Sequence, residues 1–396
     1  MAKDKLTVLA HTVEPVHNFY KTQFGINVPG VNYVRTFDSN KTRDNFDFKK
    51  EVSGISLKSI RRKAFSKVDP FDLLKVPVVK PIQTDCDLVH MAGVIPLTSA
   101  PWVVDFEEVS MFAHYNSKSM HWPQYKFLFK KYFSSDNCKK ILPWTQAAKK
   151  GFEYYCKKEG IGKEVTDKLE VVYPCVEPVK PFKKKKNEKK QLLFVGKQFY
   201  LKGGLDSILA FEKLSKKIDC ELTVISKIPQ EIKEKYSSMK GLHLIEAGPK
   251  VTDEFIVSCY KKADLFIFPT HMDTLGFVIL EAMSYGLPII SVTQFAVPEI
   301  VTDNGLLVEN SCSDHENYIK IFQPRGENNY PLIDDLKSPP GEYVLNLAKS
   351  CESILTNSKM YKRMSKNSLF SINEGRFSKK ERIKTLKRIY FNAVEQ

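Results

Sequence analysis

Short apolar runs alternate with helical patterns along the second half of the chain, and this alternation predicts a parallel sheet built from βαβ units. The clearest unit begins at the apolar run 265–268, which Pro269 ends. A short polar loop leads through Gly276 into a predicted helix at 277–284, and 288–292 is the next predicted strand. We therefore expect two buried parallel strands joined by a helix.

Two carboxylates mark the loop-to-helix junction of this unit. Asp273 lies before the predicted helix, and Glu281 lies about one turn inside it. Both can project into one crevice at the carboxyl end of the strand, where open α/β sheets bind ligands. Leu275, Gly276 and Phe277 place free N–H groups at the helix N-terminus, which favours anionic or oxygen-rich ligands. The spacing alone is equally compatible with a capping role for Asp273 and a lysine partner for Glu281.

The same pattern predicts further elements on both sides of this unit. Strands are expected in the second half at 191–195, 222–225, 243–247 and 306–308, with helices at 205–214 and 252–262. Strands are expected in the first half at 6–10, 88–90 and 102–104, followed by helix, short strand and helix within 121–160. The last predicted helix spans 379–393. These elements indicate an α/β protein.

Length and composition are those of a soluble globular protein with two domains. The chain has 396 residues, of which 42% are hydrophobic and 27% are charged. No apolar run reaches the ~18 residues of a membrane-spanning helix, and the N-terminus lacks the apolar region of a signal peptide. The eight cysteines are scattered without metal-ligand spacing. We therefore expect reduced thiols, no metal site and a cytoplasmic location.

The net charge of +15 favours an anionic partner. No zinc-finger, RNP or bZIP pattern is present, so we expect no specific nucleic-acid partner. The run 125–133 mixes aromatic residues with lysines, as membrane-interface helices do. Aromatic residues at these spacings more often form a core while the lysines extend outward, and the sequence leaves peripheral contact with an anionic membrane open.

Glycines and lysines also follow the predicted strand 191–195. The chain turns through Lys202 and Gly203 into the helix at 205–214. Glycines at this position permit a close approach of the backbone to a ligand, and Lys197 and Lys202 suit a diphosphate. Lysines that simply face solvent are the alternative interpretation.

A second candidate site follows the predicted strand 102–104 of the first half. Glu107 lies at its carboxyl end, and His114 follows seven residues later. A carboxylate at this position could orient an acceptor hydroxyl or act as a general base. The alternative is a carboxylate that caps a strand or helix end.

The stretch 263–300 resembles the carboxylate-x7-carboxylate signature of retaining family-4 glycosyltransferases, which have the GT-B fold. The matching positions are Asp273, Gly276, Glu281, Ala282, Met283, Gly286 and Pro288, followed by Pro298, Glu299 and Ile300. The resemblance implies two Rossmann-like domains facing a cleft, with a terminal helix that crosses back to the first domain. The implied boundaries are 1–177 for the acceptor domain, whose last strand is expected by resemblance at 169–174, 191–375 for the nucleotide-sugar domain and 376–396 for the terminal helix. The basic run 178–190 has no apolar periodicity, and because like charges repel, it predicts an extended linker between the domains; a nucleic-acid or nuclear-localisation patch is the alternative.

The resemblance further implies that a sugar passes from a UDP- or GDP-linked donor to a glycan, lipid-linked or other hydroxyl acceptor, with retention and without metal or cofactor. Asp273 and the amides of Leu275, Gly276 and Phe277 would hold the sugar, and Glu281 the ribose. The remaining implied roles are diphosphate binding by Lys197, Lys202 and Gly203, and contacts of Ser226, Lys227 and the Val251 backbone with the ribose and base.

This sequence departs from the family pattern at three places. Asp273 replaces the usual Glu, Lys197 replaces an Arg, and no paired glycines follow the first strand at 11–15. The charge of Lys197 is kept, although the bidentate fork is lost. The shorter Asp273 and the missing glycines give weight to an alternative function, a catalytically weak nucleotide-sugar-binding pseudoenzyme or a basic scaffold for membrane or nucleic acid.

Overall fold

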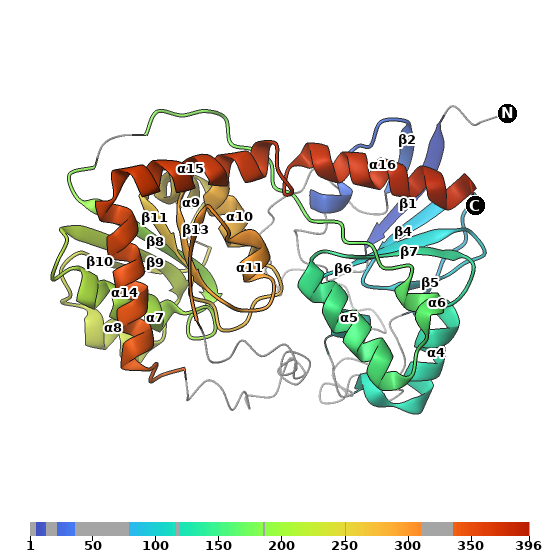
Figure 1. The fold of residues 1–396 in the computed structure, drawn as a ribbon, viewed down its shortest axis with the longest axis horizontal. Coiled ribbons are helices and arrows are strands. Elements are labelled where there is room, and N and C mark those ends of the chain that lie inside the picture. The colour runs from blue at the N-terminus through green and yellow to red at the C-terminus, as the bar shows by residue number, and fades with distance from the viewer. Residues whose placement is uncertain are drawn as a thin grey trace, which may run out of the picture. The chain divides into compact units, whose positions relative to one another are not determined.

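The computed structural model describes residues 5–12, 22–35, 79–113, 115, 119–184, 187–249, 251–309 and 336–395 (Figure 1). Within them, the chain forms two compact units, each with a parallel sheet. The described residues before Tyr173 and those from Ile383 onward form the first unit, and the others form the second. None of the helices in these residues is long and apolar enough to cross a membrane.

The first unit contains a five-stranded parallel sheet in the order β2-β1-β4-β6-β7. Its strands are β1 (Leu6–Thr12), β2 (Val31–Arg35), β4 (Leu88–Ala92), β6 (Trp102–Phe106) and β7 (Cys138–Pro143). The inner strands β4 and β6 are buried along their whole length, as expected for a parallel sheet covered on both faces. A short parallel pair joins β3 (Val79–Pro81) to β5 (Ile95–Leu97).

Helices cover the first sheet. They are the 3₁₀ helices η1 (Val109–Ala113) and η2 (Ser119–His121), and the α-helices α4 (Pro123–Phe133), α5 (Gln146–Glu159), α6 (Lys163–Thr166) and α16 (Lys379–Glu395). Phe129 and Phe133 of α4 pack against Phe152 of α5 with ring centroids 5.4 and 5.7 Å apart. This face of the aromatic run 125–133 therefore belongs to the core.

The C-terminal helix α16 completes the core of the first unit. Its buried side chains Leu386, Ile389, Tyr390 and Ala393 pack with residues of the sheet. Tyr390 Oη lies 2.6 Å from Nδ1 of the buried His90, and His90 Nε2 lies 3.2 Å from Asp105 Oδ1. Trp144 Nε1 donates to the other Asp105 oxygen at 3.2 Å. A buried polar network thus joins three strands or strand ends to the last helix.

The second unit contains a six-stranded parallel sheet in the order β10-β9-β8-β11-β12-β13. Its strands are β8 (Lys190–Gln198), β9 (Cys220–Lys227), β10 (Leu242–Glu246), β11 (Leu265–Ile267), β12 (Ile289–Val292) and β13 (Gly305–Val308). The helices are α7 (Gly204–Leu214), α8 (Gln230–Tyr236), α9 (Asp253–Lys262), α10 (Phe277–Ser284), α11 (Val297–Ile300), α14 (Gly341–Thr356) and α15 (Ser358–Asn373). The strand order is that of a Rossmann fold.

Two sequence-based expectations differ from the structure. The last strand of the first domain, expected by resemblance at 169–174, is reduced to an isolated bridge between Ile141 and Leu169. The described part of the basic run 178–190 does not extend freely by charge repulsion. Lys184 Nζ forms an ion pair with Asp264 Oδ1 at 2.9 Å, and Phe182 packs on Tyr285 with centroids 6.0 Å apart. An opposite charge and an aromatic contact hold this segment on the second unit.

Candidate functional site

Two loops meet at the point where the strand order of the second sheet reverses. The loop 199–203 connects β8 to α7, and the loop 268–276 connects β11 to α10. β8 and β11 are neighbours in the sheet, whereas the chain continues from β8 to β9 on one side and from β11 to β12 on the other. This is the topological switch point, outside whose carboxyl ends open α/β sheets bind ligands.

The two loops are tied together by hydrogen bonds. The His271 N–H donates to the Leu201 carbonyl at 2.9 Å, and the Thr270 hydroxyl donates to the same carbonyl at 3.4 Å. His271 Nε2 also lies 3.1 Å from Oδ2 of Asp206, a fully buried carboxylate in the first turn of α7. These hydrogen bonds therefore fix the positions of the two loops relative to each other.

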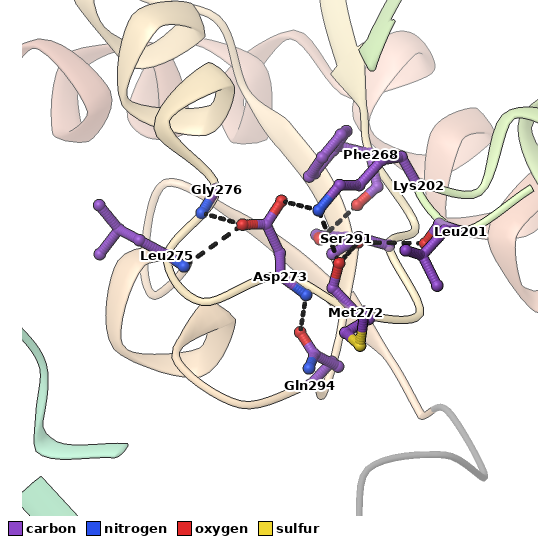
Figure 2. A network of polar contacts seen from close by, with 10 residues as sticks. Leu201, Lys202, Phe268, Met272, Asp273, Leu275, Gly276, Ser291 and Gln294 are labelled. Atoms are coloured by element: carbon purple, nitrogen blue, oxygen red, sulfur yellow. Dashed lines mark hydrogen bonds and ion pairs between the residues drawn. The ribbon is translucent and has the colours of Figure 1, made fainter. Parts of the chain in front are cut away.

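Lys202 and Asp273 come from different loops and form an ion pair at this point (Figure 2). Lys202 Nζ lies 2.8 Å from Asp273 Oδ2 and donates to the Met272 carbonyl at 2.7 Å. The other oxygen of Asp273 accepts the N–H groups of Gly276 at 2.8 Å and Leu275 at 3.3 Å. The Asp273 N–H donates to Gln294 Oε1 at 3.2 Å. The Asp273 carboxylate thus binds the two amides that precede α10 and neutralises Lys202.

Both helices that face the switch point begin at a glycine in the left-handed region. Gly203 has φ 81° and is the N-cap of α7, and Gly276 has φ 80° and is the N-cap of α10. A Cβ at Gly203 would overlap the Pro269 carbonyl, so the two loops approach more closely than any other residue allows. The positive ends of the helix dipoles make such starts suited to anions.

Glu281 lies in the second turn of α10 and is partly buried. The Tyr260 hydroxyl donates to Glu281 Oε2 at 3.2 Å, and the Tyr260 ring stacks on Tyr285 at 5.1 Å with an angle of 6°. Tyr260 therefore orients one oxygen of this carboxylate. Phe277, whose amide follows Gly276, has a buried side chain.

The other residues predicted for the nucleotide follow the neighbouring strands. Lys197 is exposed and is the second-to-last residue of β8. Ser226 is buried at the end of β9, and its hydroxyl donates to the Gly196 carbonyl. Lys227 is exposed, and the Val251 N–H donates to the Gly248 carbonyl at 2.9 Å. The structure brings Lys202, Asp273, Leu275 and Gly276 into one hydrogen-bond network beside the N-cap residue Gly203. Lys197, Ser226 and Lys227 lie near the ends of β8 and β9, and Val251 lies in the loop between β10 and α9.

In the first unit, Glu107 is half-buried and accepts the Tyr115 hydroxyl. Its neighbour Glu108 is buried and accepts the Ser110 N–H at 2.9 Å, so the capping role considered for this region belongs to Glu108. Burial raises the pKa of the Glu108 carboxyl to about 8. His114 lies outside the described residues.

Several residues of the site carry no strong sequence signal. Asp206 is a carboxylate within an otherwise mostly apolar helix, and His271 stands in a short polar loop; only their combination would have suggested a contact. Gln294 and Tyr260 come from separate elements and have no motif. Within the described residues, no group of three or more His, Cys, Asp or Glu side chains could hold a metal ion.

Part of the second unit matches a known protein family. Residues 176–322 match the family described as Glycosyl transferases group 1. The chain is 34% identical to a sulfoquinovosyl transferase of Arabidopsis thaliana over 64 residues, 16% of this chain and 12% of that protein. It is 26% identical to an uncharacterized glycosyltransferase of Haemophilus influenzae over 62% of this chain and 69% of that protein. The match to the sulfoquinovosyl transferase therefore spans much less than two thirds of that protein's length.

Solved structures resemble the whole chain. A glycosyltransferase from Rickettsia africae is 16% identical with a TM-score of 0.60, and the match covers 100% of both chains. HepE from Anabaena, in complex with UDP and glucose, is 10% identical with a TM-score of 0.55 and covers 97% of this chain and 98% of its own. The chain has the GT-B fold with two Rossmann-like domains, as the resemblance implied. The comparisons support a glycosyltransferase in general terms.

Proposed function

We propose that this protein transfers a glycosyl group from a nucleotide sugar to a hydroxyl acceptor, with retention of the anomeric configuration. The observation that carries the proposal is the contact network at the switch point, where Lys202, Asp273 and the Gly276 amide meet between two glycine-capped helix starts. The family match and the UDP and glucose in the Anabaena structure support a nucleotide-sugar donor.

In this proposal the diphosphate binds at the start of α7. Lys202 Nζ exchanges the Asp273 carboxylate for phosphate oxygens, and Lys197 adds a second positive charge. Gly203 allows the two loops to approach closely at the Pro269 carbonyl, and this approach positions the start of α7 for the phosphates. The diphosphate gains negative charge as the glycosidic bond breaks. A fixed cation and oriented N–H groups stabilise that developing charge without a metal ion or cofactor.

The sugar and the nucleoside bind around α10 and the neighbouring strand ends. Asp273 and the amides of Leu275, Gly276 and Phe277 hold the sugar hydroxyls. Since Asp273 occupies two of these amides itself, donor binding requires its carboxylate to rotate or to share them. Glu281, oriented by Tyr260, binds the ribose hydroxyls. Ser226, Lys227 and the Val251 backbone contact the ribose and base of a UDP- or GDP-linked donor.

Retention follows from attack of the acceptor on the same face from which the diphosphate leaves. The departing phosphate oxygen accepts the proton of the acceptor hydroxyl, so no protein nucleophile is needed. Glu107 and His114 are proposed to orient the acceptor in the first unit. The proposed acceptor is a glycan or a lipid-linked hydroxyl, and the reaction belongs to glycan biosynthesis of the retaining family-4 type in the cytoplasm.

The proposal is tested by measuring nucleoside diphosphate release from UDP- and GDP-linked sugars, with and without EDTA and with candidate acceptors. We expect release from one donor class that persists in EDTA and is lost in Glu281→Ala. NMR of the product's anomeric proton reports whether configuration is retained. Lys217→Met, which breaks an exposed ion pair with Glu352, is the control and should turn over normally. No release from any donor, or release unaffected by Glu281→Ala, would contradict the proposed site.

One observation favours a second candidate function. The Asp273 carboxylate already satisfies both Lys202 and the α10 amides, which would lower donor affinity and turnover. A nucleotide-sugar-binding pseudoenzyme would bind nucleoside diphosphate in an Lys202-dependent manner yet release none from the donor. The enzyme and the pseudoenzyme therefore differ in turnover, whereas a basic scaffold would lack specific nucleotide binding.

A further inference from the structure

Helix α4 of the first unit has an aromatic residue on each of two opposite faces. Tyr125, Phe129 and Phe133 are spaced four residues apart and are buried. Phe127 is 65% exposed. At about 100° per residue, Phe127 points roughly 160° away from Phe129. The core therefore accounts for one face of α4 and leaves the phenylalanine of the other face in solvent.

Lysines surround Phe127 on the same helix. Lys126, Lys130 and Lys131 belong to α4, and its sequence contains no Asp or Glu. Lys126 lies 4.0 Å from Glu159. Among the described residues, neither Lys130 nor Lys131 has a carboxylate oxygen within 4.0 Å. The outer face of α4 thus combines an exposed ring with three lysines, two of which have no carboxylate within 4.0 Å in the described part of the chain.

An exposed tryptophan lies at the start of the same helix. Trp122 is the N-cap residue of α4 and is exposed, whereas Trp102 and Trp144 are buried. Tryptophan is enriched at the level of lipid headgroups, where its ring is apolar and its N–H stays hydrated. A convex helix with a projecting ring offers no groove for a peptide, but it can insert rings between lipid headgroups while lysines contact phosphates.

We propose that the α4 face formed by Lys126, Phe127, Lys130 and Lys131, together with the exposed Trp122 at the N-terminal end of the helix, binds the surface of an anionic lipid bilayer. The helix lies in the bilayer plane, with Phe127 at the acyl boundary and the lysines at the headgroup phosphates. This inference does not depend on the proposed transfer reaction, because α4 lies in the first unit and the proposed donor site in the second. It assigns part of the chain's positive net charge to a binding surface.

Helix α15 offers a matched control. Its Phe370 is 60% exposed and the helix also carries lysines, but the adjacent Leu369 lies over Gly286 and belongs to the packing of the second unit. α15 therefore presents one exposed ring without a second aromatic residue beside it. Phe370→Ser removes an equally exposed phenylalanine from a basic helix outside the α4 face.

The experiment is sedimentation of the full chain with two kinds of vesicle. One contains phosphatidylcholine alone, and the other contains phosphatidylcholine and phosphatidylglycerol at a ratio of about three to one. We expect binding only to the anionic vesicles, weakened by salt. Phe127→Ser should weaken it about tenfold, and Lys130→Gln with Lys131→Gln about 25-fold, since each lysine near the surface adds roughly fivefold. Phe370→Ser should bind as the wild type. Circular dichroism melting checks that all variants fold. We expect them to fold, because the substituted side chains lie on the surface.

Tryptophan fluorescence gives a second readout of the same surface. Because the other two tryptophans are buried, a blue shift of the emission on adding anionic vesicles reports Trp122. We expect this shift in the wild type and its loss in Trp122→Ser. The proposal is overturned by absence of binding to anionic vesicles, by equal binding of Phe127→Ser, or by a loss in Phe370→Ser as large as in Phe127→Ser. Loss of nucleotide binding would leave these readouts unchanged.

Discussion

The ion pair between Lys202 and Asp273 allows a direct test of the donor site. Lys202 Nζ is 2.8 Å from Asp273 Oδ2, and the two side chains are 19% and 15% exposed. In Lys202→Met the aliphatic stem is kept and the charge is removed. The Asp273 carboxylate keeps its bonds from the Gly276 and Leu275 amides, so it is not left without partners. The variant should therefore fold, with a free energy of unfolding lowered by about 1 to 2 kcal/mol.

The effect on diphosphate binding should be larger than the effect on folding. A hydrogen bond from an ammonium to a phosphate contributes about 1.5 to 3 kcal/mol, which corresponds to a roughly 10- to 150-fold weaker Kd. The Lys217–Glu352 pair has the same 2.8 Å length, but its side chains are 54% and 34% exposed. Such an exposed pair contributes only about 0.2 to 1 kcal/mol, so Lys217→Met serves as the matched control.

Isothermal titration of UDP and GDP into both variants separates these effects. We expect a 10- to 150-fold rise in Kd for Lys202→Met, on the order set by a charge-assisted hydrogen bond, and a wild-type Kd for Lys217→Met. Thermal unfolding measured in the same buffer shows how much of any change comes from destabilisation. A wild-type Kd in Lys202→Met would refute the assignment of this lysine to the diphosphate, whatever happens to the melting temperature.

Three further predictions concern the backbone, the first-unit network and pH. Gly203→Ala should lower the free energy of unfolding in urea by about 1 to 3 kcal/mol, because the left-handed φ and the Pro269 carbonyl exclude a Cβ. Gly151→Ala is the control and should not lower it, because Gly151 is helical and has open space around it. Tyr390→Phe should cost about 1 to 3 kcal/mol, because it leaves the buried His90 Nδ1 without its hydroxyl partner; an unchanged urea midpoint would contradict this. Burial raises the pKa of Glu108 from 4.5 to about 8. The folded state therefore retains a proton that the unfolded state has released, and this stability is complete below pH 4.5 and is lost as pH rises through about 8. Glu108→Gln should flatten that part of the stability profile, and a slope equal to that of the wild type would argue against a buried neutral carboxyl.

The local elements around α10 could be predicted from the sequence because each end carries its own signal. Gly276 begins the helix and Gly286 follows its end, so the predicted helix 277–284 matches α10 residue for residue. Apolar runs likewise predict β8, β9, β10, β11, β12 and β13 to within a few residues. The strand expected at 169–174 is wrong, because its resemblance rested on a short apolar stretch that pairs at one residue only.

The contacts that build the candidate site could not be derived in the same way. Lys202 meets Asp273 only because β8 and β11 are neighbours, although β9 and β10 separate them in the sequence. The same holds for His90 and Tyr390, which are 300 residues apart and meet when α16 packs on the first sheet. The sequence identifies both carboxylates and the lysine of the site, whereas the simultaneous bonding of Asp273 to Lys202 and to the Leu275 and Gly276 amides depends on side-chain geometry. The roles of Glu107 and His114 stay predictions.

The central claim is that the switch point of the second sheet binds the donor of a glycosyl transfer. The most direct measurement is calorimetric titration of UDP, GDP, ADP and CMP into the wild type and Glu281→Ala, with and without Mg²⁺. The account predicts that one of these nucleotides binds specifically, with the same Kd in EDTA, and that Glu281→Ala binds it much more weakly because the ribose contact is lost. Equal binding of that nucleotide by wild type and Glu281→Ala, or no nucleotide binding by the wild type, would contradict it.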